Sequence, residues 1–262
     1  MSVLTNSYYG GLRAVGIPAL RRRLDGGLIL CYHNVVGAER DRLDTQGLHE
    51  TRGRFERQMH WLVRHYQVVS LREFVNALFA GASMRSLAAV TFDDGYRGVF
   101  EHAVPILTAF NVPATIFVVT GAVGTDTPFV WDGPAPYRPA DWATIRAALN
   151  GRVELGAHST RHPSLPALGA AELEYEVVAS RARIEAEIGV APEFFAYPYG
   201  HWDRRVRDVV RSAGYRAAVT LDFGLNTRAA DPWALRRVNV PAGISDAAFE
   251  AWTAGCRGLK IH

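Results

Sequence analysis

The chain has few of the features that mark a specialised class of protein. Its 262 residues include only two cysteines, Cys31 and Cys256, which form neither a disulfide framework nor a Cys-x-x-Cys metal motif. Cys31 lies in an apolar run, so we expect it to be a small core residue. No apolar run reaches the roughly 18 residues of a membrane-spanning helix. Repeats, low-complexity tracts and obvious linkers are also missing from the sequence, which leaves an ordinary globular chain.

A strong excess of charge of one sign is missing as well. The formal net charge is +3, and no long run of Lys or Arg occurs, so nucleic acid is not predicted as a partner. Apolar residues make up 48% of the chain, which is typical of a soluble enzyme and excludes extensive disorder. The first residues contain no apolar segment of signal-peptide length, and Arg21–Arg23 follows the apolar stretch instead of preceding it. These features predict a cytoplasmic location.

Residues 1–27 form a segment of mixed character before the first apolar strand. Apolar residues and arginines are spaced in it as in a basic amphipathic segment: Leu12, Val15, Ile17, Leu20, Arg13 and Arg21–Arg23. Such a segment predicts a weak contact with a membrane surface, here the inner face of the cell membrane. Packing against the rest of the domain and a solvated arm are the alternatives.

Short apolar runs alternate with helical patterns from residue 28 onward. The predicted strands are Leu28–Tyr32, Gln67–Val69, Ala88–Phe92, Ala114–Val118, Val153–Gly156, Phe194–Tyr197, Ala217–Thr220 and Arg237–Val240. Apolar stripes predict helices over Gly53–His65 and Gly169–Ile188. The alternation is typical of a parallel sheet with crossover helices. We therefore expect an α/β fold in which seven or eight such units close into a (β/α) barrel, as a single domain over residues 28–262.

Polar clusters follow four of the predicted strands. These are His33, Asp93 with Asp94, His158, and the turn Pro198–Gly200. Because the catalytic groups of such barrels lie at the carboxyl ends of the strands, we expect the four clusters on one face. His33 is suited to titrate near neutral pH as a general acid. A histidine at the edge of the core is the alternative for this residue.

The adjacent carboxylates are the strongest local signal. Two acids at a strand end point in different directions, so one can bind a metal while the other holds water. Gly95 permits the sharp turn that follows Asp94. The alternative is that Asp94 caps a helix that begins at Tyr96.

Two histidines supply the next signal. His158 and His162 are spaced i, i+4, which places them on one face of a helical turn as a bidentate pair for a divalent metal. With Asp94 they complete a set of two histidines and one carboxylate, which leaves coordination positions open for water and substrate. In the turn Pro198–Gly200, the Tyr199 N–H is a candidate donor to an oxyanion. Taken alone, that pattern is only a turn after a strand.

Together these residues resemble the polysaccharide deacetylase family, also called the NodB-homology domain or carbohydrate esterase family four. The likeness rests on Thr-Phe-Asp-Asp-Gly at 91–95 and on His-Ser-x-x-His about 65 residues later, and it extends from residue 28 to about 240. The resemblance implies a distorted (β/α) barrel, usually of seven strands. It implies that Asp93 is the catalytic base and that the Tyr199 N–H stabilises the oxyanion. The implied metal ligands are Asp94, His158 and His162, commonly around Zn²⁺, with Co²⁺, Ni²⁺ or Mn²⁺ as alternatives.

Two departures from the family pattern bear on the site. Ala196 stands where the family usually has an arginine that orients the base, and we hypothesise that Arg237 supplies this guanidinium from another strand. An arginine on the surface of a strand is the alternative. The strand that ends in the histidine stands first here, as in the permuted branch of poly-N-acetylglucosamine deacetylases, which implies that His33 is the catalytic acid. Its rival is His262, a terminal residue, and such residues are usually poorly positioned.

The resulting prediction is a hydrolase of carbon–nitrogen bonds other than peptide bonds. It removes the N-acetyl group of an acetylated sugar, either in a polymer or in a lipid-linked or nucleotide-linked glycan precursor. A metal-dependent amidase for non-sugar amides is one alternative. A catalytically silent glycan-binding domain is the other.

Overall fold

The computed structural model describes residues 3–37, 44, 46–132, 137–149 and 151–257. Eight strands of this part form one parallel, curved sheet: β1 (Leu28–Tyr32), β4 (Gln67–Val68), β5 (Leu87–Phe92), β6 (Ala114–Val118), β7 (Val153–Ala157), β8 (Phe194–Ala196), β9 (Ala217–Val219) and β10 (Val238–Asn239). The strand order is β10-β1-β5-β6-β7-β8-β9, with β4 beside the start of β5. A parallel bridge between Val219 and Leu235 brings β9 toward the segment before β10. The predicted α/β fold, a distorted barrel in a single domain, is confirmed.

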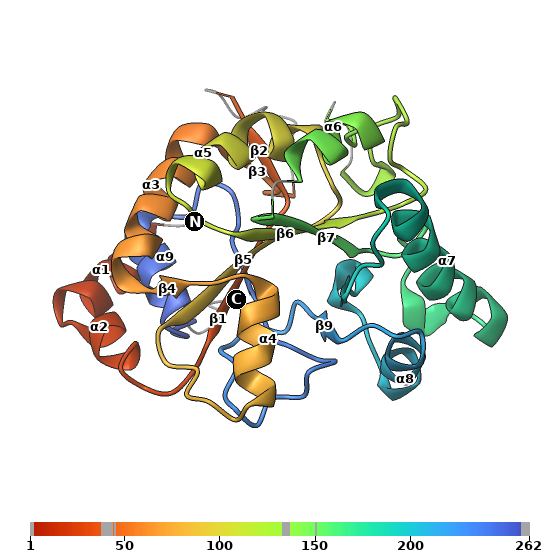
Figure 1. Ribbon diagram of the computed structural model, residues 1–262. Helices are drawn as coiled ribbons and strands as arrows, with labels where there is room; N and C mark the ends of the chain where they lie inside the picture. Colours follow the sequence, from red (N-terminus) through yellow and green to blue (C-terminus); the bar gives the residue numbers. More distant parts are fainter. Residues whose placement is uncertain (1–2, 38–43, 45, 133–136, 150, 258–262) are drawn as a thin grey trace.

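Helices such as α3, α5 and α7 lie on the outer side of this sheet, whereas α4 packs against its inner face (Figure 1). Their bounds are α1 (Val3–Ala14), α2 (Ile17–Arg21), α3 (Arg52–His65), α4 (Leu71–Phe79), α5 (Val104–Ala109), α6 (Trp142–Ala148), α7 (Ala170–Ile188), α8 (Arg204–Ser212) and α9 (Asp246–Thr253). The two helices predicted from apolar stripes are α3 and α7, each within a residue of its predicted range. Helix α7 ends at Gly189, whose left-handed φ of 76° is typical of the residue that stops a helix.

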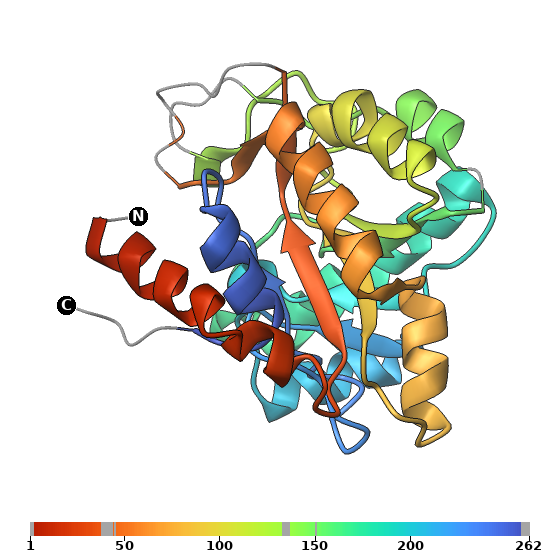
Figure 2. The same ribbon diagram turned by 90° about the vertical axis from the view of Figure 1, so that its left-hand side faces the viewer.

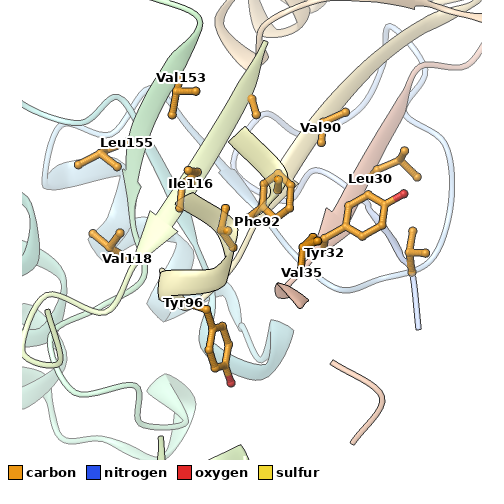
Figure 3. Packing of buried hydrophobic residues seen from close by; sticks show 14 of the residues in the cluster. Leu30, Tyr32, Val35, Val90, Phe92, Tyr96, Ile116, Val118, Val153 and Leu155 are labelled. Carbon is orange, nitrogen blue, oxygen red and sulfur yellow. The ribbon is translucent and has the colours of Figure 1, made fainter. Parts of the chain in front are cut away.

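Side chains alternate between the two faces of each strand, and this alternation divides the core. The outward residues of β1, β5, β6 and β7 pack beneath the helices (Figure 3): Leu30, Tyr32, Val90, Phe92, Ile116, Val118, Val153 and Leu155. Residues of the other face form a second cluster with α4: Ile29, Ala89, Phe117, Phe194, Leu71, Phe74, Val75 and Leu78. Helix α4 therefore closes the apolar floor of the barrel.

Polar residues follow the apolar floor along the same inward face. Two positions beyond Ile29 comes Cys31, and β5 places Thr91 beside it in register. Two positions further along the same inward face come His33, directly after β1, and Asp93, directly after β5. The open end of the barrel is therefore polar because the inward sequence of each strand changes from apolar to polar toward its carboxyl end.

A small second sheet was not predicted. Strands β2 (Asn34–Val36) and β3 (His49–Thr51) pair in parallel over three residues each. His49 is fully buried, and its ring nitrogens lie 3.0 Å from the Asn34 amide and 2.9 Å from Asp132 Oδ1. These strands are too short for a period of two to show in the sequence, and a polar network fixes them.

The N-terminal segment packs against α9 (Figure 2). The buried Tyr9 accepts a hydrogen bond from the Trp252 indole at 2.7 Å, and Arg13 pairs with Glu250 at 3.2 Å. The packing alternative is thus confirmed, and the solvated arm is wrong. Several apolar side chains of the segment nevertheless remain exposed: Val15 (72%), Leu20 (64%) and Leu24 (60%). Contact with a membrane surface and a cytoplasmic location stay predictions. Within the described residues, no helix is long and apolar enough to cross a bilayer.

The packing of α4 against the apolar floor of the barrel yields a stability prediction. Phe74 is fully buried in the barrel floor, so Phe74→Ala leaves a cavity and is expected to cost ~3–5 kcal/mol of unfolding free energy. Phe79 on the same helix is 50% exposed and stacks with Arg216, so Phe79→Ala is expected to cost ~1 kcal/mol or less. Urea unfolding of both variants measures the difference. Equal losses would show that α4 does not seal the floor.

Candidate active site

The carboxyl ends of β1, β5, β7 and β8 bring the predicted site residues to one end of the barrel. Asp93 and Asp94 follow β5, His158 follows β7, and Tyr199 follows β8. Arg237 enters from the segment just before β10, which pairs with β1. His262 lies outside the described residues.

Three side-chain atoms form a nearly equilateral triangle. Asp94 Oδ1 lies 3.6 Å from His158 Nε2 and 3.5 Å from His162 Nε2, and the two nitrogens are 3.2 Å apart. Ligands bound to Zn²⁺ at roughly 2.0–2.1 Å in a tetrahedron lie about 3.4 Å from one another. The triangle therefore has the size of one face of a tetrahedral metal site, and the fourth direction is left for water or substrate.

The surroundings favour a metal in this triangle. Asp94 Oδ1 is buried and has no hydrogen-bond partner among the described residues. Burial and then the charge of Asp93 raise the pKa of Asp94. Burial and then His158 lower the pKa of His162 to about 2, which favours the neutral imidazole with a free nitrogen lone pair. A bound cation would favour the charged carboxylate and the neutral imidazoles together.

Neighbouring groups orient the three ligands. His158 Nδ1 lies 2.7 Å from the Ala196 carbonyl, so it carries the proton and leaves Nε2 free as a ligand. The Trp131 indole donates to Asp94 Oδ2 at 3.3 Å, and its ring stacks on His162 at 4.0 Å between centroids. These two contacts assign Trp131 to the support of the ligands.

The two histidines do not lie on a helical turn, so that part of the prediction was wrong. They occupy a loop in which Ser159 and His162 have φ values of 62° and 64°, and the Ser159 hydroxyl accepts from the His162 N–H at 2.9 Å. Glu176 of α7 anchors this loop from beneath. It is fully buried and accepts hydrogen bonds from the N–H groups of Thr160 and Arg161 and from the Arg161 guanidinium.

The sequence did not lead us to predict a role for Glu176, although its position on the apolar side of a helix indicated one. It stands next to Val177 within the apolar stripe of α7. A carboxylate on the buried face of a helix requires partners, because a lone buried charge is costly. The partners of Glu176 are N–H groups and a guanidinium in the loop that holds His162.

The alternative of Asp94 as a helix cap is also wrong. Asp94 has a φ of 70° and Gly95 a φ of 78°, so the chain turns sharply and aims the carboxylate at the histidines. A Cβ atom on Gly95 would lie 2.8 Å from Val118 Cγ1. Glycine is therefore required both by the backbone conformation and by the close approach.

Asp93 lies beside the triangle in a buried ion pair. Arg237 donates to both of its oxygens, from Nη1 to Oδ1 at 2.7 Å and from Nη2 to Oδ2 at 2.6 Å, and the guanidinium is fully buried. Arg237 also donates to the Thr220 carbonyl and the Thr91 hydroxyl. Burial raises the pKa of Asp93, but the charges of Arg237 and His158 outweigh it and hold the pKa well below its usual range. The alternative of a surface-facing Arg237 is wrong.

Cys31 makes a contact that the sequence did not indicate. It is buried, as predicted for a core residue, yet its thiol donates to Asp93 Oδ2 across 3.4 Å. Burial raises the pKa of the thiol, so it is protonated and serves as a donor. Three donor atoms therefore hold the Asp93 carboxylate.

His33 is partly buried next to Cys31 and Asp93. Burial lowers its pKa to about 4; the charge of Asp93 opposes this shift, and that of Arg237 adds to it. The role of His33 as a general acid stays a prediction.

Tyr199 forms the rim of the site. Its φ of 59° is left-handed, and Gly200 follows with 70°, so the turn after β8 folds tightly against Leu221. The Tyr199 ring is 44% exposed and packs edge-on against His162 at 4.4 Å between centroids. The predicted role of its N–H stays a prediction.

Comparison with known proteins agrees with this arrangement. The family description "Polysaccharide deacetylase" matches residues 81–218. YxkH of Bacillus subtilis, whose name assigns it provisionally to polysaccharide deacetylases, is 24% identical over 86% of this chain and 75% of its own length. The poly-beta-1,6-N-acetyl-D-glucosamine N-deacetylase of Escherichia coli K12 is 27% identical over 77% of this chain but only 34% of its own.

Solved structures show the same fold. IcaB from Ammonifex degensii superposes with a TM-score of 0.74 at 24% identity, covering 88% of this chain and 98% of IcaB. The deacetylase PplD of Streptococcus pyogenes, solved with acetate, also gives 0.74, at 20% identity and with coverage of 89% and 99%.

The family pattern spans more than half of the chain. The paired acids and both histidines converge at the barrel end as expected, and Arg237 joins them from the segment before β10, as hypothesised. This protein therefore belongs to the polysaccharide deacetylase family and is a hydrolase of carbon–nitrogen bonds other than peptide bonds.

Proposed function

We propose that the chain is a metal-dependent deacetylase that removes the N-acetyl group from an acetylated amino sugar. The observation that carries the metal requirement is the triangle of Asp94, His158 and His162, whose edges of 3.2–3.6 Å fit one face of a tetrahedral site. A divalent metal bound there, zinc first among the candidates, would polarise the amide carbonyl and lower the pKa of a water molecule.

Asp93 is the proposed base. Its lowered pKa keeps the carboxylate ionised, and the fork of Arg237 fixes its orientation. Asp93 takes a proton from the attacking water, and the Tyr199 N–H donates to the oxyanion that forms. Because Arg237 is buried and paired before substrate arrives, the base needs little reorganisation during the reaction.

His33 is the proposed acid for the leaving nitrogen. An amine leaves poorly unless it is protonated, so a donor other than Asp93 is required. Burial lowers the pKa of His33, and the negative charge of the tetrahedral intermediate favours its protonated form. As the intermediate forms, His33 takes up a proton from solvent and donates it to the sugar nitrogen, so that the C–N bond breaks and the amine leaves. Asp93 then releases to solvent the proton that it took from the water.

For the substrate we propose a glycan that contains N-acetylglucosamine, as a polymer or as a lipid-linked or nucleotide-linked precursor. The names of the Escherichia coli and Staphylococcus aureus relatives support the sugar. Acetate release from a panel of these glycans and of small non-sugar amides tests the assignment. Release from the amides alone would favour the amidase alternative.

The first test concerns the metal. Dialysed wild-type protein is expected to hold about one zinc per chain, and the double variant Asp94→Ala, His158→Ala almost none, because the triangle loses two of its three ligands. His201→Ala, at an exposed histidine nearby, is the control that should keep the metal. Metal analysis by mass spectrometry gives the answer. A wild-type chain that takes up no zinc or cobalt would overturn the mechanism.

The second test concerns Arg237. Arg237→Ala leaves a buried carboxylate unpaired, which is expected to cost ~3–5 kcal/mol of stability at neutral pH. It also raises the pKa of Asp93, so the acid-side fall of kcat/KM moves to higher pH, because the base acts only when ionised. The pH–rate profile measures this shift. Arg237→Lys keeps the positive charge but loses the paired donation to both carboxylate oxygens. The acid-side fall of its kcat/KM should lie between those of the wild type and Arg237→Ala.

Arg236→Ala is the matched control, since its exposed side chain precedes the buried one in sequence. It should leave the profile unchanged. The sign for stability follows from linkage: the lowered pKa of Asp93 stabilises the wild type above the unfolded-state value of about 3.9, and this contribution disappears as the pH falls. Full turnover of Arg237→Ala would remove Arg237 from the proposed site.

The third test separates the acid from the base. His33→Ala is expected to lower kcat for the sugar amide by ~10²–10⁴-fold, the usual loss for one acid or base. A 4-nitrophenyl acetate substrate needs no protonated leaving group, so its hydrolysis should fall far less. Equal losses on both substrates would contradict the role of His33 as the acid.

A further inference from the structure

One cluster of ligand-type side chains remains after the metal triangle is assigned. Cys31, His33 and Asp93 each present one ligand atom, and these atoms all lie within 4.8 Å of one another. Cys31 belongs to β1, which pairs with β5, and the alternation of side chains directs all three residues into the open end of the barrel. His33 is only partly buried, whereas Cys31 and Asp93 are buried.

The sulfur and the carboxylate are spaced for a shared ion. Cys31 Sγ lies 3.4 Å from Asp93 Oδ2, with the thiol proton between them. In a tetrahedral zinc site with Zn–S of roughly 2.3 Å and Zn–O of roughly 2.1 Å, the two ligands are about 3.6 Å apart. A metal ion that takes the place of the thiol proton therefore requires a shift of only about 0.2 Å.

Arg237 is the main obstacle to a cation here, because its guanidinium pairs with Asp93. The net charge of the cluster nevertheless stays negative when the Cys31 thiol is ionised. A Cys31 thiolate, Asp93 and Arg237 together carry a net charge of −1, equal to that of Asp94 with two neutral histidines. Arg237 also occupies only two of the roughly four lone-pair positions of the carboxylate, and loss of the thiol proton frees a third.

We propose that Cys31, His33 and Asp93 form a second, weaker metal site for thiophilic divalent cations such as Zn²⁺, Co²⁺ and Cd²⁺. Binding breaks the Cys31 S–H bond, forms a sulfur–metal bond and releases the proton to solvent. His33 contributes a neutral imidazole nitrogen, and Asp93 contributes the oxygen that faces the sulfur. Thiolate and imidazole are the donors that these cations favour over Mg²⁺ or Ca²⁺.

Occupation of this site blocks the reaction. The ion engages both the carboxylate assigned as base and the imidazole assigned as acid. Excess zinc therefore inhibits, whereas the first equivalent activates. This consequence rests on the proposed function, but the binding of the ion does not.

The binding test uses Co²⁺ added to metal-free protein. Coordination of sulfur produces a thiolate-to-cobalt absorption band in the near ultraviolet, which the Asp94 triangle, lacking sulfur, does not produce. The wild type is expected to bind two ions and to develop the band. Cys31→Ser should bind one ion without the band. Cys256→Ser, which alters the chain's other cysteine, should retain both the second ion and the band.

Two results would overturn the site: a wild-type chain that saturates at one ion without the band, or a band that persists in Cys31→Ser. If Cys31→Ser does not fold, His33→Ala provides a second variant. It should weaken binding of the second ion by about 10–100-fold or more, a loss that even changes beyond the ligands can cause. Unaltered affinity in His33→Ala would also contradict the proposal.

The inhibition test compares activity at one equivalent of zinc and in excess. Wild-type turnover is expected to fall by ~10²-fold or more when the second site fills, because both base and acid are taken. Cys31→Ser, relative to its own activity at one equivalent, should not fall. A cobalt–thiolate band in a chain that deacetylates no substrate would support the second site while contradicting the proposed function.

Discussion

The ion pair of Arg237 and Asp93 is the interaction on which the active end of the barrel depends. Both side chains are buried, where a single charge is costly, and each makes the other tolerable through two short hydrogen bonds. The pair lowers the pKa of Asp93 and so keeps its carboxylate ionised, whereas the pKa of the neighbouring Asp94 is raised. Among the described residues only Asp93 of the two adjacent acids pairs with a guanidinium, so their pKa values shift in opposite directions. In the proposed mechanism this difference suits Asp93 to the role of base and Asp94 to that of metal ligand.

The barrel makes this charge arrangement possible through its layers. Inward side chains change from apolar at the α4 end to polar at the carboxyl ends of the strands, so the charged groups lie above a packed apolar cluster. The loops above them are fixed by side chains behind the site, with Glu176 beneath the histidine loop and the Ala196 carbonyl against His158. Such support matters because catalytic groups act well only when held in one geometry.

The sequence predicted the strands well because buried parallel strands are short, continuous apolar runs. It also predicted which residues meet, since the ends of parallel strands share one edge. The failures have a common physical origin in contacts made by loops and between distant strands. The His158–His162 spacing suggested a helix, yet positive φ values create the pair. Local pattern also cannot show that Cys31 touches Asp93, or that burial lowers the pKa of His33.

The pairing of β1 with β10 joins segments that lie far apart in the sequence. The partner of Asp93 stands 144 residues later, directly before β10. During synthesis Asp93 is therefore without its guanidinium until residue 237 has left the ribosome. A nascent chain, or one truncated before Arg237, would have to expose or protonate this acid. Assembly of the charged centre is thus tied to synthesis of the chain as far as Arg237, and a product that ends before this residue lacks the ion pair.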